Sequence, residues 1–124
     1  MEWSKGDILK SKHEDAIHPI LFLEGYDDSY FIGAMISTKG PKRYPDSIPM
    51  KEEHFEKIDE NGQTYETYFG PSFLVDALLL KEHRWQPFDK TGRLTPIGFE
   101  FVQDRIMGKY PMLWKEYKEY RRNR

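Results

Sequence analysis

The stretch HPILFLEGYDDSYFIGAMIST, residues 18–38, decides the fold because it holds two apolar runs separated by a turn. Residues 19–23 form a continuous apolar run of strand length, and residues 30–38 carry the strongest strand pattern in the chain. Residues 24–29 are turn-forming by composition, since Gly and Asp tolerate tight backbone conformations. Gly33 inside the second run indicates a bulge or a close approach of another backbone segment.

Further strands are expected on either side of this pair. Residues 5–11 predict a short first strand. Residues 72–81 predict a buried strand, although their Ala and Leu content also allows a helix. Asn61-Gly62 is a strong signal for a hairpin turn, and residues 50–58 fit either a helical turn or an edge strand.

The end of the chain predicts helices. Thr95 can cap a helix that has Pro96 in its first position, and apolar residues then recur at helical spacing. Gly108 is a natural stop and Pro111 a natural restart for a second helix. We therefore expect a mostly β fold with C-terminal α structure: one domain over residues 1–124, an antiparallel barrel or sheet closed by a helical extension over residues 96–124.

Composition narrows the function classes. The 124 residues include no cysteine, which excludes a disulfide framework and a thiolate metal site. No window resembles a membrane span or a signal peptide, so a cytoplasmic protein with no membrane partner is expected. Residues 105–124 carry seven Lys/Arg and two Glu, whereas the rest carries twelve basic and nineteen acidic residues. An acidic body with a basic tail is not typical of a general nucleic-acid binder, so any such contact should be local.

His18 is the most distinctive of the four histidines because Pro19 follows it. A residue before proline is pushed into an extended backbone, which fixes the direction of its side chain at the mouth of the strand. An imidazole there can transfer a proton near neutral pH. The residues alone favour a plainer interpretation, a rim histidine with one backbone hydrogen bond. The spacing of His13, His18, His54 and His83 does not match a zinc site, and no metal or other cofactor is expected.

A second candidate group lies at the end of the strongest strand pattern. Ser37 and Thr38 end that run, and a loop rich in Gly and Pro follows them. Hydroxyls beside a basic loop can hold a phosphate, and a tyrosine there can stack on a base. An ordinary polar strand exit explains the same residues. The basic and aromatic members of this loop are Lys39, Lys42, Arg43 and Tyr44.

Three other features have both a structural and a functional interpretation. Asp76 lies inside an apolar run, so it must find a partner, a cleft, a subunit interface or the surface. The basic and aromatic residues 83–96 fit nucleic-acid contact, but a plain connection from strand to helix is favoured. The basic end of the chain fits a partner contact or a solvated helix terminus.

Several blocks together resemble the MazF/PemK-like toxin family. They are KGDIL, HPILFL, FIGAMIST and SFLVDALLLKEHRWQPFDKTGRLT, followed by a final helix. Family members open with G-D-[IV] and R-P-V-L-V-[IV], and an apolar strand ending in I-T or I-T-S follows. A segment of the type V-D-Q-I-R-x-[IL]-D-K-x-R-L then precedes the last helix. The order and spacing of the blocks cover nearly the whole chain.

The resemblance implies a small SH3-like antiparallel β-barrel with helices, usually assembled as a homodimer. Many family members are endoribonucleases of type II toxin–antitoxin systems. Without a metal, they use the 2′-hydroxyl of single-stranded RNA to attack the adjacent phosphate, and a cognate antitoxin protein covers the RNA groove. A non-catalytic barrel that inhibits a protein target, like the CcdB branch that acts on gyrase, is the alternative function. A plain interaction domain is a third.

The resemblance also assigns site residues. The family's arginine before proline falls on His18, which would act as general base or acid, and the hydroxyl that closes the third strand falls on Ser37, with Thr38 beside it. Lys39 would offset charge on the phosphorane. The chain departs from the family in having His in place of Arg. Its preceding loop is acidic, with Glu14 and Asp15, where the family has a Gly-rich loop.

Overall fold

The computed structural model describes residues 3–12, 18–65 and 72–122 of the chain. The sequence features at His13, Glu14, Asp15, residues 66–71 and Arg124 lie outside this part. In chain order, the described elements are β1 (Asp7–Ser11), β2 (Ile20–Gly25), β3 (Tyr30–Ser37), the 3-10 helix η1 (Gly40–Lys42), β4 (Ile48–Met50), η2 (Glu52–His54), β5 (Ser72–Leu74), β6 (Leu79–Glu82), η3 (His83–Trp85), β7 (Phe88–Arg93), α1 (Pro96–Ile106) and α2 (Trp114–Arg122).

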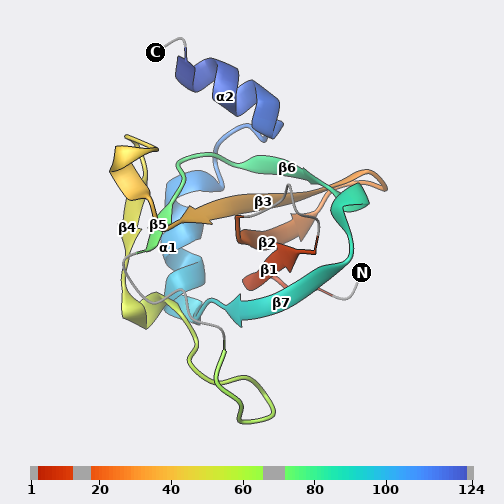
Figure 1. The fold of residues 1–124 in the computed structure, drawn as a ribbon, viewed down its shortest axis with the longest axis vertical. Coiled ribbons are helices and arrows are strands. Elements are labelled where there is room, and N and C mark those ends of the chain that lie inside the picture. The colour runs from red at the N-terminus through yellow and green to blue at the C-terminus, as the bar shows by residue number, and fades with distance from the viewer. Residues whose placement is uncertain (1–2, 13–17, 66–71, 123–124) are drawn as a thin grey trace.

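The described strands form one antiparallel sheet of seven strands (Figure 1). The hydrogen-bonded order is β4-β5-β3-β2-β1-β7, and β6 also pairs with β3. Strands β2 and β3 are the predicted central pair, with Ile20 opposite Met35 and Phe22 opposite Gly33. A Cβ on Gly33 would lie 2.5 Å from the Leu21 carbonyl oxygen, so the close approach predicted there is confirmed.

Two predictions for the second half of the sheet were wrong. Residues 72–81 do not form one strand, because β5 and β6 are separated by residues 75–78 and both pair with β3. The register on β3 shifts by two residues across this break, which allows Asp76 to leave the apolar layer. Residues 83–96, interpreted as a plain connection, contain β7, which pairs with β1 along the edge of the sheet.

The helices and turns agree better with the sequence pattern. The Thr95 hydroxyl accepts a hydrogen bond from the Gly98 N–H at 3.0 Å and Pro96 occupies the first turn, as predicted for α1. Helix α1 packs closely on η2, since a Cβ on Gly98 would lie 2.1 Å from the His54 carbonyl oxygen. Asp59 accepts the N–H groups of Asn61 and Gln63 in the predicted hairpin turn.

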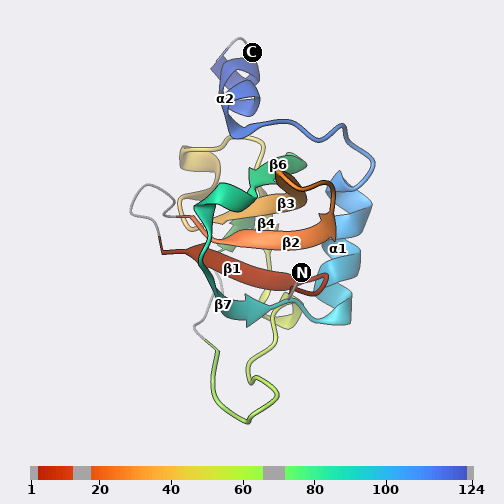
Figure 2. The same ribbon diagram turned by 90° about the vertical axis from the view of Figure 1, so that its right-hand side faces the viewer.

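The core has two sides. Helix α1 lies along one side of the sheet (Figure 2). On that side, Leu21 and Ala34 of the central strands pack with Val102 and Ile106 of α1. On the other side lie one cluster around Phe22 and Phe31 and a second that includes Met35, Tyr44, Leu79 and Tyr117 of α2. Helix α2 stands at the end of the molecule, beyond β6 (Figures 1 and 2). It is this second side that carries the candidate site.

The strands described here do not close into a barrel through regular pairing. The ends of the sheet path, β4 and β7, are joined outside the strands by an isolated antiparallel bridge between Phe55 and Leu94. The Glu56 N–H also donates to the Arg93 carbonyl at 2.8 Å. The coarse expectation, antiparallel β structure with C-terminal helices, is confirmed.

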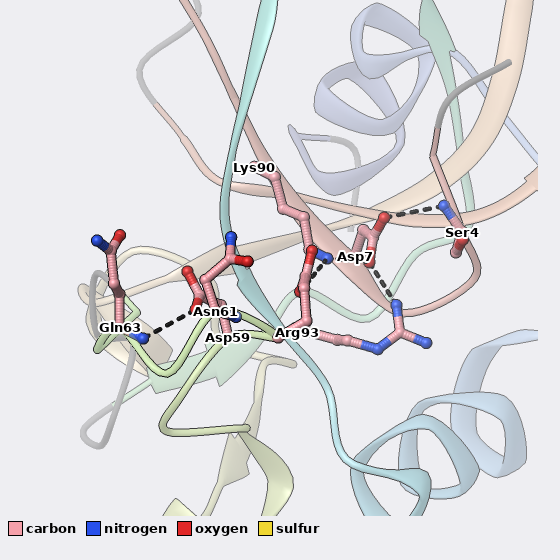
Figure 3. Close-up of polar contacts among 8 residues, drawn as sticks. Ser4, Asp7, Asp59, Asn61, Gln63, Lys90 and Arg93 are labelled. Carbon is pink, nitrogen blue, oxygen red and sulfur yellow. Dashed lines mark hydrogen bonds and ion pairs between the residues drawn. The ribbon is translucent and has the colours of Figure 1, made fainter.

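A buried carboxylate joins β1 to β7 (Figure 3). Asp7 is 3% exposed, and its side chain accepts the Ser4 N–H at 2.9 Å and a hydrogen bond from the Arg93 guanidinium. The Lys90 ammonium lies 3.4 Å from the same carboxylate. The charge of Asp7 is therefore satisfied within the protein, which explains why an aspartate can occupy a buried strand position. Among the described helices, none has both the length and the apolar character needed to cross a bilayer.

Candidate functional site

His18 lies two residues before β2, and Ser37 is the last residue of the neighbouring strand β3. The Ile36 N–H donates to the Pro19 carbonyl at 3.2 Å, and Ile20 is the register partner of Met35. The same register, continued by one residue beyond that hydrogen bond, sets His18 opposite Ser37. Side chains alternate along strands, so Ser37 shares a face with Met35. The ring of His18 lies on the same side, because it meets Tyr44, which packs in the core cluster of Met35. The sequence hypothesis required this neighbourhood.

The surroundings of His18 favour its neutral form. Burial lowers its pKa, and the positive charges of Arg43 and Lys81 lower it further. The ring also meets the Tyr44 ring edge-on, with centroids 6.4 Å apart. An imidazole with a pKa below its usual 6.5 is mostly unprotonated at neutral pH. His18 therefore suits the role of proton acceptor better than the role of a fixed positive charge.

Lys81 on β6 is the cation that sequence reasoning missed. It is the register partner of Phe31, and its stem lies alongside Gly33, where a Cβ would be 3.4 Å from the Lys81 Cγ. Burial lowers the pKa of Lys81, and the Glu82 carboxylate opposes this shift. In the described part of the chain, no carboxylate lies within ion-pair distance of the Lys81 ammonium. The sequence signal was a lysine at the end of an apolar strand pattern.

The loop after β3 divides into exposed cations and buried groups. Thr38, Lys39, Lys42 and Arg43 are exposed. Ser37 is only 2% exposed, and its Oγ accepts the Lys39 N–H at 3.0 Å. The Ser37 hydroxyl thus orders the start of the basic loop and still has its own proton to donate.

Tyr44 does not have the exposed position that its place in a loop indicated. Its ring is 1% exposed and belongs to the core cluster with Met35 and Leu79. Base stacking on this ring is therefore blocked in the conformation described here. The sequence missed the burial because the covering residues come from α2, about 70 residues later in the chain.

Helix α2 covers Tyr44 with two side chains. Trp114 meets the Tyr44 ring at 6.2 Å between centroids, and the Arg121 guanidinium lies 4.7 Å from the centre of the same ring. Arg121 also donates a hydrogen bond to the Arg43 carbonyl at 3.0 Å. The Lys81 ammonium is 6.0 Å from the centre of the Trp114 ring. Part of the basic tail thus contacts the candidate site instead of being fully solvated.

The remaining sequence candidates lie elsewhere. His54 is buried in contact with Phe101, and its Nδ1 accepts the Lys51 N–H at 2.9 Å. Burial lowers the pKa of His54, and the Glu53 carboxylate opposes this shift. The His83 ring packs on Phe31. Among the described residues, no three His, Asp or Glu side chains are grouped to hold a metal ion.

The arrangement is suited to an anion. It places a neutral imidazole and a serine hydroxyl beside two cations, Lys81 and Arg43, and leaves three more polar side chains of the basic loop on the surface. Lysine and arginine near hydroxyl groups are the usual partners of phosphate oxygens. Lys81 forms no ion pair within the described part of the chain, so its charge is available to a ligand.

Comparisons of the chain with protein-family models, with curated proteins and with solved structures gave no match.

Proposed function

We propose that this protein is a metal-independent endoribonuclease of the MazF/PemK-like type, with the sheet arranged as an SH3-like barrel. The observation that carries the proposal is the position of His18, close enough to two cations, Lys81 and Arg43, for both to lower its pKa, beside the strand that ends at Ser37. The bridge between Phe55 and Leu94, across the two ends of the sheet path, supports the barrel arrangement. The proposed substrate is single-stranded RNA that enters over the exposed basic loop.

The proposed reaction uses His18 as general base. The imidazole removes the proton of a ribose 2′-hydroxyl, and the 2′-oxygen attacks the adjacent phosphorus. The bond from phosphorus to the 5′-oxygen breaks, and solvent supplies the proton to that oxygen. The products are a 2′,3′-cyclic phosphate and a 5′-hydroxyl end. Lys81 and Arg43 offset the charge that builds on the phosphorane, and the hydroxyl of Ser37 or Thr38 donates to a non-bridging oxygen.

This assignment accounts for the main departure from the family pattern. Histidine in place of the arginine before proline removes a permanent positive charge from the groove. In this chain Lys81 and Arg43 supply positive charge to the same place and favour the neutral form of His18. In this proposal, Lys81 and Arg43 supply the positive charge that the arginine supplies in the family, and His18 acts as the base.

The test is incubation of the purified full chain with single-stranded RNA in EDTA, with cyclic-phosphate ends as the readout. His18→Ala and Lys81→Met should each lower the cleavage rate by about a hundredfold. Lys57→Met is the matched control for Lys81→Met, because Lys57 is exposed and pairs with Glu52 at 2.7 Å, and it should retain activity. Full activity of His18→Ala would overturn the assignment.

A second function is favoured by the burial of Ser37 and by the burial of Tyr44 beneath Trp114 of α2. A non-catalytic barrel that binds and inhibits a protein target needs no accessible hydroxyl. Induced expression in a bacterial host separates the two functions: growth arrest that persists in His18→Ala, without cyclic RNA ends, supports the binding module. Under either function, we propose a homodimer neutralised by a cognate antitoxin.

A further inference from the structure

A pocket of about 250 Å³ lies beside α2 and plays no part in the proposed ribonuclease site. Its walls come from four separate segments: the turn before β4, the break between β5 and β6, the connection after α1, and α2 itself. The residues that matter are Asp46, Asp76, Lys109, Tyr110, Tyr117 and Tyr120. This is the pocket that receives Asp76, the carboxylate inside an apolar run that the sequence left unexplained.

Three tyrosine side chains line the pocket, one from the core and two from the surface. Tyr110 is 90% exposed and Tyr120 is 56% exposed, whereas Tyr117 is buried behind them at 5%. Tyrosine combines a large apolar ring with a polar tip, and the face of the ring attracts positive charge. Exposed rings around a concave surface therefore favour a ligand that is both cationic and partly apolar.

The charge of the pocket points to the same ligand. Two carboxylates line it, Asp46 and Asp76, against one ammonium group, Lys109. Burial raises the pKa of Tyr117, the Arg121 guanidinium opposes this shift, and the Asp76 carboxylate adds to it. The negative charge of Asp76 is thus felt at the aromatic wall, and the balance of charge disfavours phosphate and other anions.

Lys109 shows that a positively charged group pairs with the Asp76 carboxylate. Its ammonium nitrogen lies 3.5 Å from the Asp76 carboxylate, and the two side chains are 44% and 30% exposed. An exposed ion pair of this kind contributes little free energy, so an external cation can replace the lysine at small cost. We propose that this pocket binds an organic cation, an ammonium or guanidinium group on a short apolar stem, for which Lys109 is an internal substitute.

The size of the pocket limits the ligand further. Sites for drug-sized molecules usually have about 300–1,000 Å³. The smaller pocket here suits a single lysine or arginine side chain of a partner polypeptide, or a free cation of similar size. Both sources share the same recognition chemistry, a positive group held by carboxylates and aromatic rings.

The test is NMR titration of the ¹⁵N-labelled full chain with three compounds: N-acetylarginine methylamide, its neutral citrulline analogue and tetramethylammonium. The cations should shift the amide signals around Asp76 and Tyr110, and the citrulline compound should not. Tyr110→Ala and Asp76→Asn should each weaken binding of the arginine compound by about fivefold. Lys109→Met should strengthen it, because the internal competitor is gone, and Asp104→Asn on the exposed face of α1 should change nothing.

A short peptide with one central arginine distinguishes the source of the cation. Tighter binding of the peptide than of the free arginine compound assigns the pocket to a partner polypeptide, and equal binding assigns it to a small cation. Either result supports the proposal. Binding of the citrulline analogue as strong as that of arginine, or weaker binding in Lys109→Met, would overturn it. Tyr110 is exposed, so its variant keeps the test valid if Asp76→Asn fails to fold.

Discussion

Two groups of charged residues in this protein differ in how their charge is balanced. Asp7 on β1 is buried, and the Arg93 guanidinium, the Lys90 ammonium and a backbone N–H all contact its carboxylate (Figure 3). Lys81 on β6 is partly buried, and no carboxylate in the described residues forms an ion pair with it. One cluster is complete by itself, and the other still lacks a counter-charge.

The difference separates a structural role from a functional one. A buried charge with all its partners links two strands, and its loss leaves those partners unsatisfied. A buried charge without a counter-ion reduces stability, so its presence is better explained by a ligand that supplies the missing charge. The two clusters should therefore respond in opposite directions to neutral substitutions.

The largest change in the free energy of unfolding is expected at Asp7 and its partners Arg93 and Lys90. Asp7→Asn should lower the free energy of unfolding by about 3 kcal/mol, because Arg93 and Lys90 lose their shared carboxylate. The measurement is urea unfolding followed by tryptophan fluorescence. Asp89→Asn is the matched control on the neighbouring edge strand: its pair with Lys12 is 3.5 Å long and exposed, so the loss should stay below about 1 kcal/mol. Equal losses in the two variants would show that Asp7 is not a structural centre.

At Lys81, which has no ion-pair partner in the described residues, a neutral substitution should not lower the free energy of unfolding. Lys81→Met keeps the apolar stem and removes the charge, so the free energy of unfolding should stay the same or rise by about 1 kcal/mol. RNA cleavage should fall as proposed above. A loss of stability as large as that of Asp7→Asn would mean that Lys81 has a structural partner and would remove the distinction between the clusters.

The pH dependence of the free energy of unfolding should report on His18 and its neighbour Lys81. The pKa of His18 is lowered in the folded protein, so the unfolded chain binds a proton more readily. The contribution of His18 to stability is therefore fully present above about pH 6.5 and is lost as the pH falls below that value. His18→Gln should reduce this acid-side loss, measured by unfolding at several pH values. Lys81→Met should raise the pKa of His18, read from its ring proton signals by NMR, and an unchanged pKa would place the two groups too far apart to cooperate.

The smallest change in the free energy of unfolding is expected at Arg121, the α2 residue that lies over the Tyr44 ring. Arg121→Ala removes the guanidinium from the Tyr44 ring and the hydrogen bond to the Arg43 carbonyl, so the unfolding free energy should fall by about 0.5–1 kcal/mol. Tyr44 should become more accessible, which fluorescence quenching by acrylamide can detect. The neighbouring residue Arg122 is exposed, and Arg122→Ala should leave both measurements unchanged.

Local sequence signals predicted the centre of the fold well. The two apolar runs around residues 24–29 became β2 and β3, and the Thr95-Pro96 signal became the capped start of α1. Residues 72–81 were misread because their run of apolar residues has no local sign that the register on β3 must shift after Leu74. Strand β7 was missed because its residues, FDKTGR, show no clear apolar alternation and are held by pairing with β1.

The candidate site could be predicted only in part. His18 and Ser37 could be predicted from the sequence, because His18 precedes a proline and Ser37 ends a strand pattern. The pairing of β2 with β3 brings their backbones to adjacent positions. Lys81 could not be found in this way, since its nearness to His18 depends on β6 pairing with the far edge of β3 and on the space beside Gly33. The burial of Tyr44 depends on α2 in the same way.

The amino-acid sequence by itself determined the central strand pair β2–β3, the capped start of α1, the turn at Asn61-Gly62 and the presence of a histidine before proline, because each of these depends on residues close together in the chain. Only the tertiary structure decided which charges are balanced and which are not. The energy of a charge depends on its neighbours in space and on its exclusion from water. Asp7 contacts Arg93 across a strand pair and Asp76 contacts Lys109 across the pocket, whereas the Lys81 ammonium lies 6.0 Å from the centre of the Trp114 ring.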